Sequence, residues 1–147
     1  MPSIKLKELV DGKIDIYQYC IKKKTPLLIT EIFEVFPSLA GWNPDFLLKK
    51  VGRNVVDVNT SDNDVFQEYH RPIKMSLDQY SSEIDAKQTT SGRRLYMGAQ
   101  GINQCFPELI SEIKFDTLLP QDKLGLNYLW YGPEGNTTGL HYDSADN

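Results

Sequence analysis

Residues 129–143 read LWYGPEGNTTGLHYD and carry more information about the fold than any other stretch. The first three are apolar or aromatic, as in a strand, and residues 132–136 have the composition of a turn. The segment that follows, residues 137–143, is expected to be extended. His141 and Asp143 then point to the same side, about 6–7 Å apart along the backbone. An imidazole and a carboxylate in this position can bind one ion of Fe(II), Mn(II) or Zn(II).

A histidine two residues before a carboxylate is weak evidence when taken alone. The chain contains two histidines and 20 acidic residues among 147 positions, so such a pair arises by chance in about one chain in four. A histidine hydrogen-bonded to a carboxylate on a strand is also a common structural pair. The other histidine, His70, precedes Pro72 in a polar segment, and we expect it on the surface and not on the metal.

Composition bounds the class of protein. A content of 40% hydrophobic residues in 147 is enough for one domain with a core. The predicted domain spans residues 1–147, with a helical and strand region over 1–92 and the first core strands over 93–147.

A net charge of −4 does not favour DNA binding. Two cysteines suggest a reducing intracellular setting, cytoplasmic or nuclear, and no apolar run is long enough to span a membrane.

Local signals predict short helices followed by strands. Helices are expected over residues 15–24, from a cap at Asn43 to a stop at Gly52, from Ser76 through Ile84, and from Pro107 through Ile113. Strands are expected over residues 27–30, 55–58, 94–97 and 124–131. Residues 81–92 are polar and are expected to form a surface loop.

With these elements in place, the stretch 129–143 closely resembles the metal-binding stretch of the Jumonji C-type, cupin-like (cupin 8) oxygenases. The likeness covers nearly the whole chain and is strongest after Gly125. Its pattern is most similar to the small hydroxylases of that family, such as the asparaginyl hydroxylase that inhibits hypoxia-inducible factor. The resemblance implies a mainly β domain with N-terminal helices, the first part of a double-stranded β-helix, or jelly roll. It also implies that the chain stops inside the domain, after the strand that carries His141.

The resemblance assigns roles to five residues. His141 and Asp143 match two of three Fe(II) ligands, whereas Tyr96, Thr138 and Asn147 match residues that contact the cosubstrate 2-oxoglutarate. Hydroxyl and amide groups suit this task because they donate hydrogen bonds to a carboxylate. Thr138 lies three residues before His141 and would face away on a regular strand, so a bulge or kink at Gly139 is expected.

The implied activity is that of an Fe(II)- and 2-oxoglutarate-dependent dioxygenase. A protein side chain is the expected substrate, a modified nucleoside in RNA is the alternative, and a homodimer is possible for the fold. The third metal ligand and a basic partner for 2-oxoglutarate are expected beyond residue 147, so the 147-residue chain alone is expected to be inactive. Two alternatives stay open: a non-catalytic cupin-like binding module, and a metal-dependent cupin that does not use 2-oxoglutarate.

Overall fold

The computed structural model describes residues 2–62, 65–66, 72–85, 92–113 and 125–138. These residues form two compact units. The first unit takes its described residues from 1–42 and 109–125, and the second from 43–108 and 126–143. No helix among the described residues is long and apolar enough to cross a membrane. The predicted single domain is not tested by this division and stays a prediction.

The helices and strands are mostly short. In chain order they are β1 (Ser3–Lys5), α1 (Leu6–Val10), the π-helix η1 (Tyr17–Lys22), β2 (Leu28–Thr30), α2 (Ile32–Val35), the 3-10 helix η2 (Pro37–Gly41), α3 (Pro44–Val51), β3 (Val55–Ser61), β4 (Val65–Phe66), β5 (Ile73–Ser76), α4 (Leu77–Asp85), β6 (Arg94–Gly101), α5 (Ile102–Cys105), the 3-10 helix η3 (Pro107–Glu112), β7 (Tyr128–Tyr131) and β8 (Thr137–Thr138).

The first unit has a small apolar core beside a pair of parallel strands. Strand β1 pairs with β2, with Ser3 opposite Leu28. Leu6, Leu9 and Phe36 are buried at the centre of the cluster. Six partly buried apolar side chains pack around these three, and they are Ile4, Ile14, Ile16, Ile29, Val35 and Leu39.

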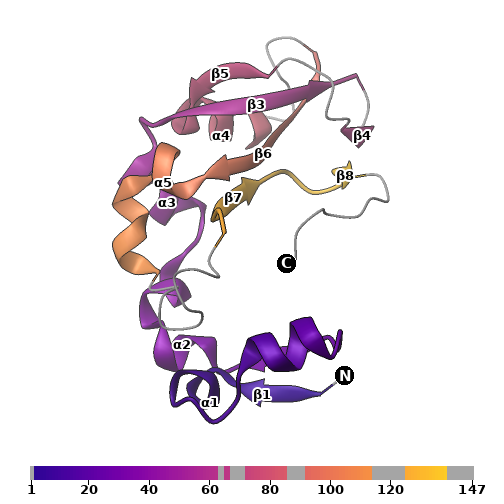
Figure 1. Ribbon diagram of the computed structural model, residues 1–147. Helices are drawn as coiled ribbons and strands as arrows, with labels where there is room; N and C mark the ends of the chain where they lie inside the picture. Colours follow the sequence, from indigo (N-terminus) through magenta and orange to yellow (C-terminus); the bar gives the residue numbers. More distant parts are fainter. Residues whose placement is uncertain (1, 63–64, 67–71, 86–91, 114–124, 139–147) are drawn as a thin grey trace. The chain divides into compact units, whose positions relative to one another are not determined.

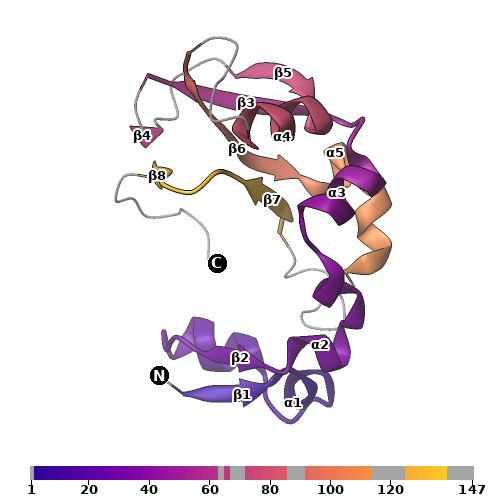
Figure 2. The same cartoon turned by 180° about the vertical axis from the view of Figure 1, so that it is seen from behind.

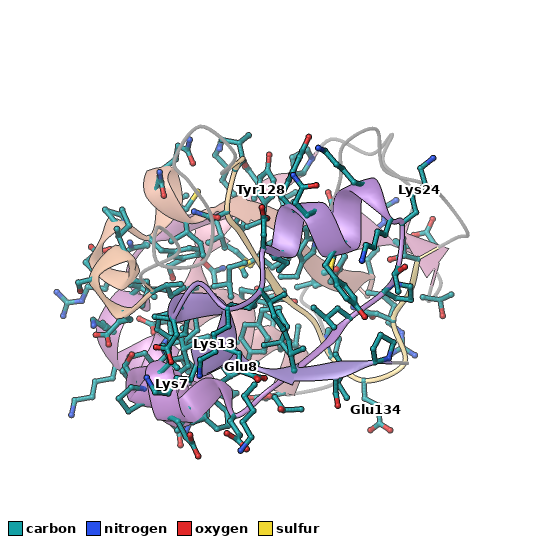
Figure 3. All side chains as sticks on the ribbon, turned by 60° about the horizontal axis from the view of Figure 1, so that its bottom comes forward. Lys7, Glu8, Lys13, Lys24, Tyr128 and Glu134 are labelled. Atoms are coloured by element: carbon teal, nitrogen blue, oxygen red, sulfur yellow. The ribbon has the colours of Figure 1, made fainter. Side chains whose placement is uncertain are left out.

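Charges on the surface of the first unit are paired at close range. Lys7 and Lys13 lie near each other in Figure 3, and their amines are 2.9 and 3.7 Å from the carboxylate of Asp11. The hydrogen bond from Lys7 lowers the pKa of Asp11. Such exposed pairs contribute little to stability. Asp11 offsets only part of the positive charge of these two lysines.

The second unit is built on a four-stranded antiparallel sheet in the order β5-β3-β6-β7. Helix α4 packs against β3, β5 and β6, and Figure 1 shows it beside these strands. Strands β4 and β8 form a separate parallel pair, with Val65 opposite Thr137. Figure 2 shows this pair from behind, where β8 follows β7 along the chain. The segment that leads from β7 to β8 therefore starts at the edge of the main sheet.

The helix-covered face of the sheet holds the core of the second unit. Along β3, Val56 and Val58 are 1% and 0% exposed, while Val55 is 58% exposed. This alternation is expected of a strand with one covered face. The core also contains Leu47, Val51, Met75, Leu77, Tyr80, Leu95, Met97, Ile102 and Phe106.

Two helix starts in the second unit confirm the predicted caps. The Asn43 carboxamide oxygen accepts a bond from the Phe46 N–H at 2.9 Å, and Gly52 follows the last residue of α3. The Ser76 hydroxyl accepts a bond from the Gln79 N–H at 3.2 Å, at the start of α4.

The predicted surface loop over residues 81–92 is wrong in its first part. Helix α4 continues through Asp85. Ser81 is 1% exposed and its hydroxyl lies 3.2 Å from the Tyr131 hydroxyl. A polar residue is thus accommodated inside the helix because a partner on a distant strand satisfies it.

Other predicted elements agree in place but differ in type or length. The helix predicted over residues 15–24 is present as the π-helix η1. The helix predicted from Pro107 is the 3-10 helix η3. Strand β7 begins at Tyr128, and Leu124, where the prediction began, lies outside the described residues.

Candidate functional site

The candidate site is built on the face of the sheet opposite the core. Tyr96 lies on β6 between Leu95 and Met97, which are 2% and 0% exposed and belong to the core. Its side chain therefore points to the other face. Asn59 on β3 stands directly opposite Tyr96 in the antiparallel register and shares that face. The sheet thus presents a phenol and an amide side by side on its uncovered side.

A third strand contributes to the surroundings of Tyr96 at the point where β7 ends. A Cβ atom placed on Gly132 would lie 2.7 and 2.9 Å from Tyr96 Cδ2 and Cε2, and 2.8 Å from Asn136 Nδ2. The Tyr96 ring and the Asn136 amide therefore both lie close to Gly132, in the space that a side chain at this position would occupy. Asn136 Nδ2 is buried and has no hydrogen-bond partner among the described residues. Tyr96 thus reaches the segment that runs into β8.

The register between β6 and β7 is held by a buried side chain from α4. Tyr80 is 0% exposed, and its hydroxyl donates to the Tyr131 carbonyl at 2.6 Å and accepts from the Met97 N–H at 3.1 Å. Met97 and Tyr131 are opposite each other in the two strands. The Tyr80 ring also meets the Tyr131 ring edge to face, with centroids 5.6 Å apart. Helix α4 therefore helps to fix where β7 delivers Gly132 beside Tyr96.

The pairing of β6 with β7 is interrupted by a β-bulge or similar irregularity. The ladder between β6 and β7 shifts register between Met97 and Gln100. The Gln100 side chain accepts from the Asp57 N–H and donates to the Asp57 carbonyl, each at 3.0 Å. A side-chain amide thus takes the place of a strand partner for Asp57. Bulges of this kind are frequent beside functional sites, where they re-aim a side chain.

The environment of Tyr96 favours a neutral hydroxyl. Burial raises the pKa of this phenol above its ordinary value. A tyrosine hydroxyl is protonated at neutral pH with or without this shift, and it can donate a hydrogen bond. A donor of this kind suits a ligand carboxylate.

Thr138 lies in β8, where it is exposed and stands opposite Phe66 of β4. It follows Asn136 by two residues, so the structure brings Tyr96 close to the segment that carries Thr138. His141, Asp143 and Asn147 lie outside the described residues, as do His70 and the predicted kink at Gly139. Within the described part of the chain, no three His, Cys, Asp or Glu side chains form a group that could hold a metal ion. The roles of these residues stay predictions.

Taken together, these elements define a β-domain in which one face of an antiparallel sheet is backed by a helix. The comparison with protein families makes this assignment more specific. The chain belongs to the cupin-like domain family, whose model matches residues 14–147. Proteins of this family generally bind Fe(II) together with 2-oxoglutarate. The match confirms the predicted fold class. No curated protein matches the chain.

Several residues of the site were not anticipated from the sequence. Tyr96 is surrounded by Asn59, Gly98, Gly132 and Asn136. The sequence alone does not show that these residues lie together. Gly132 and Asn136 were recognised as turn residues alone. A local signal did exist at Gly132, because the glycine follows an aromatic strand directly and such a position often marks close approach of another group.

Proposed function

We propose that this chain is part of an Fe(II)- and 2-oxoglutarate-dependent dioxygenase that hydroxylates a protein side chain. The observation that carries the proposal is the family match over residues 14–147, which includes both His141 and Asp143. In this proposal the His141 imidazole and the Asp143 carboxylate are two of the iron ligands. The similarity of residues 129–143 to the small protein hydroxylases supports a protein substrate, and the net charge of −4 favours it over RNA.

The donor groups assigned to the cosubstrate fit a dicarboxylate. In the proposal, Tyr96 and Thr138 donate from their hydroxyls, and Asn147 from its amide, to 2-oxoglutarate. When bound, Fe(II) and 2-oxoglutarate supply the activation of dioxygen, with succinate and carbon dioxide as by-products. The chain orients the cosubstrate and keeps one face of the sheet available for it.

Turnover by the 147-residue chain alone is expected to be low. An iron site of this class needs two histidines and one carboxylate. The chain has two histidines, and we place only His141 on the metal. Equal succinate release per molecule by this chain and by a longer form that adds a second histidine ligand would contradict this part of the proposal. We also propose an intracellular location, cytoplasmic or nuclear, which the low cysteine content supports.

Calorimetry of a longer form that adds a second histidine ligand, with Mn(II) in place of Fe(II), tests the proposed ligands. We expect 2-oxoglutarate to bind only when Mn(II) is present, and His141→Ala to abolish both binding events. His70→Ala is the matched control, because it removes the other histidine and is expected to leave binding unchanged. Metal binding without 2-oxoglutarate binding would instead favour a cupin with different chemistry. Absence of both would favour a non-catalytic module.

A further inference from the structure

Two glycines border the Tyr96 ring where the backbone itself does not require glycine. Neither Gly98 nor Gly132 has a φ in the left-handed region, unlike Gly135 in the following turn, where φ is +90°. Backbone conformation therefore does not explain why these two positions are glycine, whereas the limited space beside them does. At Gly132 an added Cβ would overlap the ring, with Tyr96 carbons at 2.7 and 2.9 Å. At Gly98 it would lie 3.0 Å from Asn59 Nδ2 and 3.9 Å from Tyr96 Cε1.

Two amides complete the surroundings of the ring. Asn59 faces Tyr96 across the β3–β6 ladder. The Asn136 amide lies on the other side, 2.8 Å from the point that a Gly132 Cβ would occupy. Asn136 Nδ2 is buried although no described residue accepts its hydrogen bond. Burial of an unpaired donor lowers stability.

We propose that Gly98, Gly132, Asn59 and Asn136 form a seat that positions the Tyr96 side chain for ligand binding. The seat is defined by these four residues, which come from β3, β6 and the segment after β7. It holds the ring in one orientation before a ligand arrives, so that the hydroxyl is presented without a further loss of side-chain freedom. The four are positioning residues that act through Tyr96. The inference rests on the proposed function for the identity of the ligand, a dicarboxylate of the 2-oxoglutarate class.

Gly132→Ala tests the seat directly, because the added methyl group must displace the ring or the Asn136 amide. In a longer form that adds a second histidine ligand, with Mn(II) present, we expect Gly132→Ala to weaken the binding of 2-oxoglutarate about tenfold relative to the same form without the substitution. Gly41→Ala is the matched control, since an added Cβ there meets no described atom within 4 Å. It is expected to leave the affinity unchanged.

A double-mutant cycle separates positioning from general damage. In a Tyr96→Leu background the ring is gone, so Gly132→Ala is expected to have no further effect on affinity. The double variant is also expected to recover the melting temperature that Gly132→Ala alone loses. If Gly132→Ala weakens binding equally in both backgrounds, the seat is wrong.

Alkaline titration of tyrosine absorbance gives a readout that needs no ligand. If Gly132→Ala turns the ring out of its seat, one of the eight tyrosines should ionise at a lower pH than in the parent chain. The change should vanish in a Tyr96→Phe background. An unchanged titration curve for folded Gly132→Ala would overturn the inference. A changed curve in a chain that binds no 2-oxoglutarate would keep the seat and refute the proposed ligand.

Discussion

The hydroxyl of Tyr80 offers a sharp test of how the site is held together. Tyr80→Phe removes a single oxygen that accepts from the Met97 N–H at 3.1 Å and donates to the Tyr131 carbonyl at 2.6 Å. The ring itself is 0% exposed and keeps its packing in the variant. The substitution therefore isolates two hydrogen bonds at the junction of β6 and β7.

The expected cost follows from those two bonds. A buried hydrogen bond contributes about 0.5–1.5 kcal/mol net, and a backbone group left unpaired costs about 1–3 kcal/mol. We expect Tyr80→Phe to lower the free energy of unfolding by about 2 kcal/mol. For a chain of this length that corresponds to a fall in melting temperature of roughly 4–8 °C.

Chemical denaturation with urea is the assay, with Tyr131→Phe as the matched control. The Tyr131 hydroxyl contacts the Ser81 hydroxyl at 3.2 Å, and its loss is expected to cost about 1 kcal/mol or less. A Tyr80→Phe variant within 0.5 kcal/mol of the parent chain, or less affected than Tyr131→Phe, would refute the view that Tyr80 holds β7 in register.

Three further outcomes are expected. Stability should fall above about pH 10, where Tyr80 and Tyr96 ionise in the unfolded chain but burial keeps both pKa values higher in the folded one; alkaline melting curves that are flat between pH 10 and 11 would contradict this. Asn43→Ala should cost about 1 kcal/mol in urea denaturation through loss of the α3 cap, and an effect near zero would argue against the cap. Gln100→Leu should cost about 1–3 kcal/mol in the same assay because both backbone groups of Asp57 lose their partner; a neutral result would show that β3 finds another partner there.

The sequence was informative wherever the cause of a structure is local. Helix α3 has its cap at Asn43, a proline at the first helical position and Gly52 after its end, and its predicted bounds are confirmed. Ser76 likewise marks the start of α4. The helix predicted through Ile84 is also present and ends at Asp85. The polar composition that predicted a loop from Ser81 was misleading, because the Ser81 hydroxyl is satisfied by Tyr131, which lies 50 residues further along the chain.

The candidate site likewise contains residues that the sequence pointed to and residues that only the structure brings together. Resemblance to a known family assigned Tyr96 and Thr138 to the site from the sequence, and these assignments stay predictions. The cupin-like family itself is confirmed. The close approach of Tyr96 to Gly132 joins residues that are far apart in the chain, and no local pattern contains it. The roles of His141 and Asp143 stay predictions that rest on the sequence.

The most direct test of the central claim is calorimetric titration with 2-oxoglutarate, with and without Mn(II), of a longer form that adds a second histidine ligand. We predict heat of binding only in the presence of Mn(II), its loss in His141→Ala, and its retention in His70→Ala. Binding that is independent of Mn(II), or that survives in His141→Ala, would contradict the proposed iron and 2-oxoglutarate site.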